Sequence, residues 1–375
     1  MARPSDKNDI KWMKKALKLA VKGKGYASPN PLVGCVIVSS TNEMLGQGFH
    51  ERYGEAHAEV NALKSVNDKS KLEGATVYVT LEPCSHHGKT PPCAETLCTF
   101  PIGRVVCAME DPNPQVQGCG IKLLKERGIT VETGILEKEA AKMNEAFIFF
   151  MKYRKPYVIL KIAQTLDGYI SAPDGNSRWI TSIESRKKVH EWRSTYDAVM
   201  IGRNTASTDN PNLTVRHVKG RQPKRVVIDG NLSLPKDLNL FTDQHEEKTI
   251  VITHDEEEYN KHADPMLNIL QTNYFRGKTL LVSQLNGHSD LNQAIEKLGE
   301  MNITSVLVEA GSDLATALIT QNLVDKIYLF IAPKILGGGA RSVLGLGINH
   351  MEDVLKLHTT SWERSGEDML FTGYF

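Results

Sequence analysis

The first part of the chain alternates between a helical spacing of apolar residues and short continuous apolar runs. Trp12, Met13 and Ala16 begin a stripe that predicts an amphipathic helix over residues 9–21, packed against a core. Apolar runs bounded by turn residues predict strands at 32–38, 44–50, 76–81, 104–109 and 130–133. Helices are expected between them, beginning near residues 57 and 93 and covering 120–128. This alternation predicts a mixed sheet with helices on both faces.

A second alternating series begins at residue 157. Strands are predicted at 157–163, 198–202, 225–228, 249–253, 279–282, 305–309 and 326–332, with a closing hairpin at 361–375. Helices are predicted over 183–196 and 313–322. A predicted helix over 137–150 and the charged segment 152–156 separate the two series. We therefore predict two α/β domains, residues 1–152 and residues 153–375.

Length and charge limit the class of protein. A chain of 375 residues suits two domains, and 41% hydrophobic residues suffice for ordinary globular cores. The formal net charge of +1 lacks the basic excess of a nucleic-acid-binding protein, although it allows a local basic pocket. Charges interrupt the first residues, and no apolar run approaches the length of a membrane span. We expect a cytoplasmic protein with no nucleic-acid or membrane partner.

Three residues in the first third of the chain suggest a metal centre. All six cysteines lie there, and a reducing cytosol favours their use as ligands or core residues over disulfides. His57, Cys84 and Cys93 would leave one position of a tetrahedral zinc open to water, as in catalytic sites. Glu59 is too close to His57 to be an independent ligand but is well placed to move that water's protons. His-x-Glu followed by Pro-Cys and a second Cys is typical of zinc nucleobase deaminases, although these cysteines are further apart.

Other interpretations of this pattern stay open. His86 or His87 could supply a fourth protein ligand, which would make the zinc structural. Cys98 follows Cys93 on the same predicted helix and could approach the metal. A nucleic-acid or nucleoside deaminase with an appended binding domain is the alternative function. That function would need a basic face and aromatic stacking residues, which the neutral charge balance does not favour.

The segment between the cysteines carries a sharper signal. Its pattern, Pro-Cys-x-His-x-Gly-x-Thr-Pro-Pro-Cys, resembles the deaminase half of the bifunctional riboflavin-biosynthesis deaminase/reductase family. The resemblance implies a cytidine-deaminase-like domain acting on a diaminopyrimidinone that carries a ribosylamino phosphate. It implies four residues around this substrate: Asn30, His50, His86 and Lys89. Asn30 could also be an ordinary turn residue of Ser-Pro-Asn-Pro.

The second half lacks the common nucleotide-binding signatures. No Gly-x-Gly-x-x-Gly follows a predicted strand, and Pro83 and Thr272 stand where a P-loop would need glycine. Six short segments resemble, in order, the reductase half of the same family: 166–168, 177–182, 202–205, 209–211, 213–216 and 309–312. The resemblance implies a dihydrofolate-reductase-like α/β domain that uses NADPH to reduce the ribose to ribitol.

The same resemblance implies roles for residues of the second half. Substrate-binding residues would be Ser177, Arg193, Leu213, Arg216 and Glu309. Cofactor-binding residues would be Ala163, Trp179, Thr205, Asp209, Gly311 and Ser312. Asp209 is the first candidate for handling the proton of the reduction, and Lys161 the second.

Elementary chemistry is compatible with these roles. A glycine turn at a helix N-terminus suits a pyrophosphate, and guanidinium groups match a sugar phosphate. An ordinary serine N-cap and two surface arginines are the alternative interpretations. The resemblance therefore implies a bifunctional enzyme with Zn²⁺ and NADPH and a small phosphorylated pyrimidine substrate, and we expect a homo-oligomer, either a dimer or a tetramer.

Overall fold

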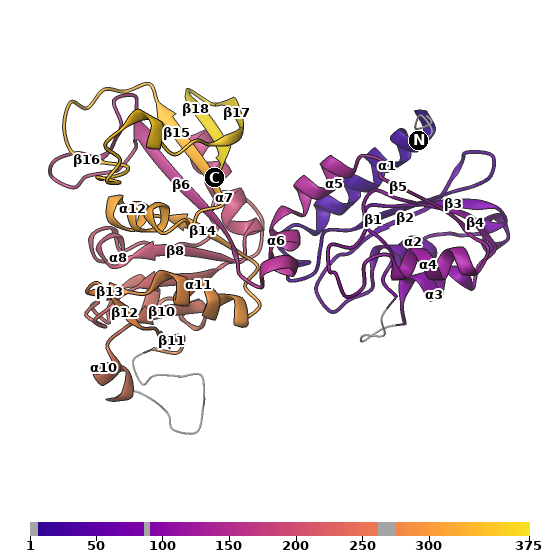
Figure 1. Cartoon of the computed structure of the whole chain (residues 1–375), viewed down its shortest axis with the longest axis horizontal. Coiled ribbons are helices and arrows are strands. Elements are labelled where there is room, and N and C mark those ends of the chain that lie inside the picture. Colours follow the sequence, from indigo (N-terminus) through magenta and orange to yellow (C-terminus); the bar gives the residue numbers. More distant parts are fainter. Residues whose placement is uncertain (1–6, 86–90, 262–274) are drawn as a thin grey trace. The chain divides into compact units, whose positions relative to one another are not determined.

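The computed structural model describes residues 7–85, 91–261 and 275–375. The chain divides into two compact units, Met1–Arg154 and Lys155–Phe375, each built on its own sheet (Figure 1). Within the described residues, no helix has both the length and the apolar character needed to cross a membrane.

The first unit contains a mixed five-stranded sheet with the strand order β2-β1-β3-β4-β5. β1 is antiparallel to both of its neighbours, whereas β3, β4 and β5 are parallel to one another. The strands are β1 (Gly34–Val38), β2 (Met44–Phe49), β3 (Ala75–Val79), β4 (Ile102–Cys107) and β5 (Thr130–Thr133). The C-terminal ends of the three parallel strands lie on the same side of the sheet. The segments that follow these ends contain several of the residues predicted to bind the metal and the substrate.

Helices cover both faces of this sheet, as the apolar pattern predicts. Cys35 and Ile37 of β1 pack with buried residues of α2, α3 and α4 on one face. The alternate residues Val36 and Val38 pack with α1 and α5 on the other. The helices of the unit are α1 (Lys7–Ala20), α2 (Ala58–Lys64), α3 (Cys93–Cys98), α4 (Cys119–Glu126), α5 (Glu137–Met143) and α6 (Glu145–Tyr153).

The prediction of one helix over residues 137–150 is wrong. Two helices, α5 and α6, meet at Asn144, whose side chain is buried. Its amide accepts a hydrogen bond from the backbone nitrogen of Leu32 at 2.8 Å and donates one to the Leu32 carbonyl at 3.0 Å. Asparagine readily replaces backbone partners in this way, and the helix ends where it does so.

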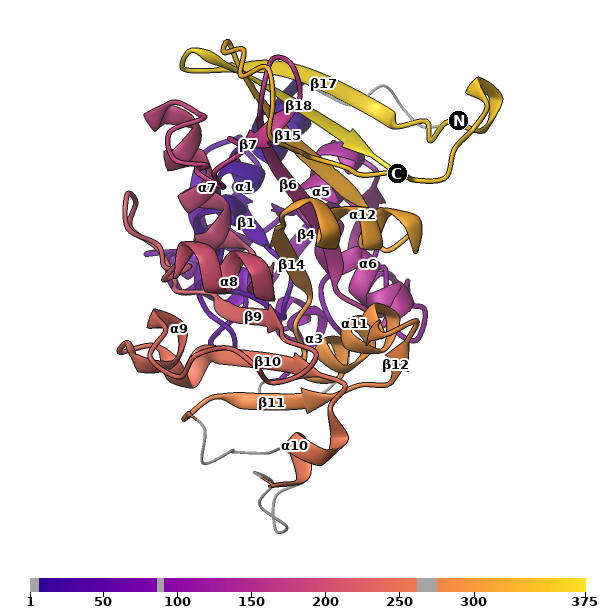
Figure 2. The same cartoon turned by 90° about the vertical axis from the view of Figure 1, so that its left-hand side faces the viewer.

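The second unit is organised around a nine-stranded sheet, ordered β11-β10-β9-β8-β14-β6-β15-β18-β17. The strands from β11 to β15 are parallel, and Figure 2 shows β9, β10 and β11 following one another toward one edge. The hairpin of β17 and β18 closes the other edge in antiparallel pairing. The strands are β6 (Tyr157–Thr165), β8 (Ala198–Gly202), β9 (Lys224–Ile228), β10 (Thr249–Thr253), β11 (Lys278–Leu281), β14 (Ser305–Glu309), β15 (Lys326–Ala332), β17 (His358–Ser365) and β18 (Asp368–Tyr374).

Helices also cover both faces of the larger sheet. Leu298 of α11 and Leu318 of α12 belong to the main core, and Val189 of α7 packs against Phe330 on a smaller one. The helices are α7 (Ile183–Thr195), α8 (Arg203–Asp209), α9 (Asn239–Thr242), α10 (Glu256–Lys261), α11 (Leu291–Glu300) and α12 (Ser312–Thr320). Short 3₁₀ turns span Val21–Gly23, Lys69–Leu72, Glu246–Lys248 and Met351–Asp353. Two small ribbons pair β7 (Tyr169–Ser171) with β16 (Ala340–Arg341) and β12 (Gln284–Leu285) with β13 (His288–Ser289).

The segment after β8 differs from its prediction. The apolar pattern predicts no helix directly after residues 198–202, but Asp209 is the last residue of α8, which follows β8 directly. The helix ends at Asn210, which adopts a left-handed conformation with φ +40°, and Pro211 prevents its continuation. This short helix sets Thr205 and Asp209 one turn apart on the same element.

Candidate active sites

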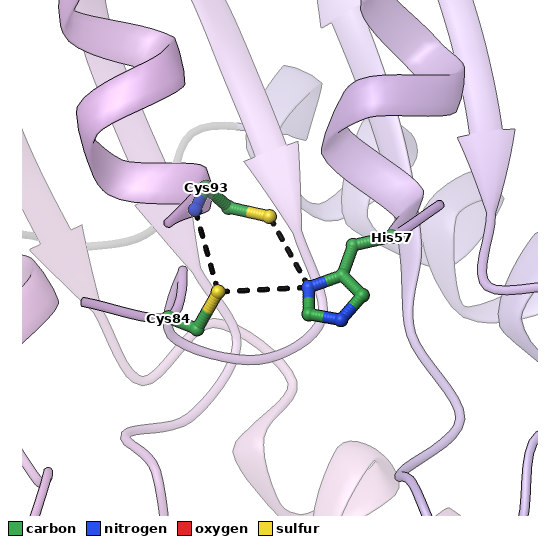
Figure 3. A group of neighbouring side chains, drawn as sticks. All are labelled: His57, Cys84 and Cys93. Carbon is green, nitrogen blue, oxygen red and sulfur yellow. Dashed lines mark hydrogen bonds between the residues drawn. The ribbon is translucent and has the colours of Figure 1, made fainter. Parts of the chain in front are cut away.

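Three side chains of the first unit converge as the sequence predicts for a metal centre (Figure 3). His57 is the N-cap of α2, Cys84 follows β3, and Cys93 is the first residue of α3. The Nδ1 atom of His57 lies 3.5 Å from Sγ of Cys84 and 3.3 Å from Sγ of Cys93. Zinc bonds of about 2.3 Å to sulfur and 2.0–2.1 Å to nitrogen at tetrahedral angles separate the ligand atoms by about 3.6 Å. The three side chains therefore fit a zinc ion.

The electrostatics of the three residues also suit a dication. Hydrogen bonds with Cys93 and then with His57 lower the pKa of the Cys84 thiol well below its ordinary value. The hydrogen bond to Cys84 and burial raise the pKa of the Cys93 thiol. The backbone nitrogen of Cys93 also donates to Sγ of Cys84 at 3.3 Å. One thiolate is thus stabilised by the protein alone, and a bound dication would stabilise the second.

Glu59 lies in the first turn of α2 with 3% of its surface exposed. Burial, followed by the charge of Cys84, raises the pKa of its carboxyl to about 7. His57, Glu59 and Cys84 all line the same cavity of about 350 Å³. A carboxyl group with a pKa near neutrality, beside a metal centre in a cavity, is suited to accept and return a proton.

Two predicted substrate residues line this cavity together. Nδ1 of His50 lies 3.2 Å from the carbonyl of Ala56, which can only accept, so this nitrogen carries the proton. Nε2 then accepts a hydrogen bond from Nδ2 of Asn30 at 3.1 Å. Burial lowers the pKa of His50, which keeps the imidazole neutral. The other two predicted residues, His86 and Lys89, lie outside the described residues, as does His87.

Glu82 is a residue of this site that the sequence did not single out. Its buried carboxylate accepts four backbone hydrogen bonds, from Asp111 and Gly118 through Oε2 and from Gly120 and Ile121 through Oε1. The four distances lie between 2.8 and 3.2 Å. The carboxylate thus ties the loop of residues 111–118, which lines the cavity, to the strand end that carries Cys84. A Glu-Pro-Cys motif directly after a strand was the available signal.

A larger cavity, of about 1050 Å³, lies in the second unit at the C-terminal ends of β6, β8 and β14. All the residues predicted for substrate, cofactor and proton transfer in this half line it: Lys161, Ala163, Ser177, Trp179, Arg193, Thr205, Asp209, Leu213, Arg216, Glu309, Gly311 and Ser312. The connection after β8 leads outward to β9, whereas the connection after β14 crosses β6 to reach β15. Such a change of direction opens a ligand crevice at the strand ends.

A buried charge cluster forms the floor of this cavity. Glu309 and Lys161 stand opposite each other on β14 and β6, with Nζ 3.8 Å from Oε2. Arg193 of α7 forms a bidentate pair with Glu309, at 2.6 and 3.0 Å. Burial alone would raise the pKa of Glu309, but Arg193 and Lys161 lower it to about 2. The guanidinium of Arg193, which was predicted to bind the substrate phosphate, is therefore already paired with the carboxylate of Glu309.

Arg216 differs from Arg193 in its surroundings. Its side chain is exposed, and within the described part of the chain no carboxylate lies within ion-pairing distance of it. Its backbone nitrogen donates to Nδ1 of His190 at 3.2 Å. Burial, followed by Arg193, lowers the pKa of His190 to about 4. His190 also lines the cavity, and the sequence did not single it out.

The remaining wall of the cavity carries the predicted cofactor residues. Gly311 is the N-cap of α12, and Ser312 donates a hydrogen bond from its hydroxyl to the carbonyl of Arg341. Trp179 is 67% exposed, and the guanidinium of Arg186 lies 4.2 Å from the centre of its ring. Burial raises the pKa of Asp209, on the side of α8 that faces the cavity.

Known proteins match both units. Residues 6–109 match the model of the cytidine and deoxycytidylate deaminase zinc-binding region, and residues 156–371 match the RibD C-terminal domain. The riboflavin biosynthesis protein RibD of Aquifex aeolicus is 42% identical over 371 residues, which cover 99% of this chain and 98% of the relative. RibD of Escherichia coli is 39% identical over 375 residues, covering 96% and 98%.

Solved structures agree with this similarity. Acinetobacter baumannii RibD superposes with a TM-score of 0.85 at 35% identity, covering 98% of this chain and 99% of that one. The diaminohydroxyphosphoribosylaminopyrimidine deaminase/5-amino-6-(5-phosphoribosylamino)uracil reductase of Thermotoga maritima gives 0.85 at 36% identity, covering 98% of each chain. The likeness therefore spans both sheets and both cavities.

Proposed function

Because the chain belongs to the RibD family of bifunctional riboflavin-biosynthesis deaminase/reductases, we propose that each of its two cavities carries one of the two reactions. The cytidine-deaminase-like unit is the deaminase, and the dihydrofolate-reductase-like unit is the reductase. The substrates are small phosphorylated pyrimidines. The buried Glu59 beside His57, Cys84 and Cys93 is the observation that carries the assignment of the first cavity.

In the first cavity, His57, Cys84 and Cys93 hold the zinc ion. Zinc in such a site supplies a water molecule whose pKa is lowered from 15.7 to about 7. Glu59 takes a proton from the attacking water and delivers one to the departing ammonia. Its raised pKa supports this role, since a shuttle works best when its pKa is close to the working pH.

The neutral His50 and Asn30 position the pyrimidine. Nδ1 of His50 is held by Ala56, so the ring has a fixed orientation, and the Asn30 amide keeps a second donor and its oxygen for the substrate. The family resemblance implies that His86 and Lys89 also hold the pyrimidine and its substituents. The result is replacement of the ring amino group by oxygen.

In the second cavity, the nucleotide cofactor is NADPH, which supplies the hydride that converts the ribosyl side chain to ribityl. The N-cap Gly311, Ser312 and Thr205 hold its phosphates where two strand ends diverge. Ala163, Trp179 and Asp209 complete the cofactor side of the cavity. Ser177, Leu213 and Arg216 hold the substrate, with the Arg193–Glu309 pair as its floor.

Asp209 is the first candidate for the proton that the reduction requires. Its carboxyl lies at the end of α8, and burial raises its pKa, which favours a protonated form more than at an exposed aspartate. Lys161 is the second candidate. Burial lowers the pKa of Lys161, whereas the charge of Glu309, 3.8 Å away, opposes this effect.

One experiment tests both assignments. The pure protein is incubated with the diaminopyrimidine substrate, with and without NADPH, and the products are identified by mass spectrometry. Without NADPH, the product should be the deaminated ribosyl compound; with NADPH, it should carry two additional hydrogens. Formation of the ribityl compound without any deamination, or no consumption of the substrate, would contradict the proposal.

A further inference from the structure

The segment of residues 210–217 in the reductase unit has two sides. It connects α8 to the approach of β9 and belongs to no helix or strand, so no regular backbone pairing fixes its shape. Four of its residues line the large cavity of this unit: Pro211, Leu213, Arg216 and His217. The backbone groups between them are bound by side chains of other elements. These side chains therefore determine how the cavity residues of the segment are presented.

The backbone of the segment is strained at Leu213. Its φ of +53° lies in the left-handed region, which a residue with a branched side chain seldom adopts. Leu213 is only 3% exposed and lines the cavity. Strained residues persist where the surrounding structure holds them, and they are concentrated at ligand sites. The conformation of Leu213 therefore requires contacts that hold the segment from outside.

Gln222 binds the backbone of Val215 on both sides. The Val215 nitrogen donates to Oε1 of Gln222 at 2.7 Å, and Nε2 of Gln222 donates to the Val215 carbonyl at 3.1 Å. One amide side chain thus replaces the partner that a neighbouring strand would supply. The same peptide group is bound at its other end, because the nitrogen of Arg216 donates to Nδ1 of His190. The backbone that leads into Arg216 is therefore fixed in both directions.

Arg225 holds the part of the segment before Leu213. Its guanidinium is 1% exposed, and Nη1 donates to the carbonyl of Asn212 at 3.2 Å and to Asp243 at 2.6 Å. Nη2 donates to the carbonyl of Leu240 at 2.9 Å. The peptide group that joins Asn212 to Leu213 is therefore tied to the connection between β9 and β10.

We propose that Gln222, supported by Arg225, is a positioning residue of the reductase, which holds Leu213 and Arg216 in their binding conformation before the phosphorylated substrate arrives. This inference rests on the proposed function of the second cavity. Neither Gln222 nor Arg225 lines that cavity, so both act on the substrate through the segment. A segment that is already ordered loses less conformational entropy when the substrate binds, which raises the affinity.

Calorimetric titration of the full chain with the deaminated pyrimidine, in the absence of NADPH, tests the proposal. Gln222→Met removes both hydrogen bonds at a similar side-chain size. If the segment then adopts its binding conformation about a tenth of the time, the apparent affinity falls about tenfold. The affinity for NADPH and kcat at saturating substrate should change by less than about twofold. Gln293→Met is the matched control, because this amide also accepts a backbone hydrogen bond, from Ser283, but lies in α11 away from the cavity.

A double-mutant cycle distinguishes positioning from general destabilisation. If Gln222 acts through Arg216, Gln222→Met should lower the affinity by less than about threefold in a chain that already carries Arg216→Ala. A general loss of stability would lower the affinity equally in both backgrounds. Thermal unfolding of each variant checks that the fold is retained. If Gln222→Met does not fold, Gln222→Glu replaces it, since this variant keeps the acceptor for Val215 but has no donor for its carbonyl at neutral pH.

The outcomes separate this inference from the proposed function. Unchanged substrate affinity in the Gln222 variant would overturn the positioning role while the reductase function stands. An equal loss of affinity for substrate and NADPH, or the full loss in the Arg216→Ala background, would overturn it as well. If the unaltered protein binds neither the deaminated pyrimidine nor NADPH, the proposed function of the second cavity fails, and this inference fails with it.

Discussion

The guanidinium of Arg193 meets the carboxylate of Glu309 edge to edge, with Nε 2.6 Å from Oε1 and Nη2 3.0 Å from Oε2. The two residues are 116 positions apart in the chain, and their side chains are only 11% and 12% exposed. Arg193 also donates to the backbone carbonyl of Thr214, in the segment that leads to Arg216. The pair therefore joins α7, β14 and the loop that carries the exposed arginine.

Loss of Arg193 should destabilise the reductase unit. Arg193→Ala leaves Glu309 buried without its main partner, and breaking a buried ion pair from one side costs about 3–5 kcal/mol. Because Lys161 remains 3.8 Å from the carboxylate, we expect a loss near the lower end, about 3 kcal/mol in the free energy of unfolding. Urea denaturation followed by tryptophan fluorescence measures this change.

A triple variant is the control for the charge cluster. Arg193→Leu combined with Glu309→Leu and Lys161→Met removes all three charges, and it should be more stable than Arg193→Ala because no buried charge of the cluster is left alone. Deaminase activity reports separately on the other unit. Unchanged stability in Arg193→Ala, together with weaker binding of the phosphorylated substrate, would show that Arg193 grips the phosphate as the sequence suggested.

Arg216 should carry the phosphate recognition that Arg193 does not. It lines the cavity, and its exposed guanidinium has no carboxylate partner in the described part of the chain. Arg216→Ala should lower the affinity for the deaminated substrate by about 10–100-fold, since a charge-assisted hydrogen bond contributes about 1.5–3 kcal/mol. NADPH affinity, measured by titration in parallel, should not change.

The phosphate itself provides the second arm of this test. The dephosphorylated substrate should bind poorly to the unaltered protein and lose little more affinity in Arg216→Ala. Arg364→Ala, on β17 and away from the cavities, is the matched control. If Arg216→Ala lowered the affinity for NADPH and left substrate binding unchanged, Arg216 would bind the cofactor. The proposed substrate and cofactor sides of the cavity would then have to be exchanged.

The residues that carry chemistry could be found from the sequence because their positions depend on local structure. Cys93 opens a helix, Cys84 follows a strand, and Glu309 ends another strand, so each stands where parallel strands present their ends. The alternation of apolar runs and helices was sufficient for the two α/β folds. Similarity to a known family supplied the substrate and the cofactor, which no spacing rule contains.

The partners of these residues could not be found in the same way. Glu82 and Arg193 act through contacts with distant segments, and Asn144 divides a predicted helix because Leu32, 112 positions away, binds its amide. A sequence pattern records which residues are apolar or polar, but it does not record which polar groups meet. The short helix α8 was missed for a related reason, since its polar sequence lacks a helical apolar stripe.

His190 gives the reductase unit a pH dependence of known sign. Its pKa is about 4 in the folded protein against an ordinary value of 6.5, because burial and Arg193 disfavour the charged ring. Below pH 6.5 the unfolded chain therefore binds a proton that the folded chain does not, and stability falls as the pH drops from about 6.5 toward 4. Denaturation at several pH values should show this fall.

Replacement of the imidazole identifies the source of the effect. His190→Gln offers an amide oxygen to the backbone nitrogen of Arg216 and does not titrate, so the loss of stability between pH 6.5 and 4 should be smaller. His288→Gln is a control with an exposed histidine. An equal pH dependence in the unaltered protein and in His190→Gln would mean that other groups produce it.

Glu82 should support deamination through the loop that it holds. Glu82→Gln replaces one acceptor oxygen by an NH₂ group, which then faces two backbone N–H donors and leaves them unsatisfied, at a cost of about 1–3 kcal/mol each. We expect a higher KM for the diaminopyrimidine with zinc retained. Glu110→Gln, directly before this loop and with its carboxylate accepting a hydrogen bond from Gln117, should leave KM unchanged. An unchanged KM in Glu82→Gln would contradict a positioning role.

Glu59 provides the strictest test of the deaminase site because its proposed role separates metal binding from catalysis. Glu59→Gln keeps the size of the side chain but cannot shuttle a proton, so deamination should fall by about 10²–10⁴-fold while one zinc per chain is retained. Cys84→Ser should instead lose both zinc and activity, since it removes a ligand. Metal analysis and a deamination assay on the same preparations distinguish the two variants, and Glu55→Gln is the control at the cavity wall.

Reduction of the already deaminated pyrimidine should proceed at the unaltered rate in Glu59→Gln, because every proposed reductase residue lies in the other unit. Loss of zinc from Glu59→Gln would make Glu59 a ligand or a structural residue, and a parallel loss of reduction would show that the two sites do not act independently.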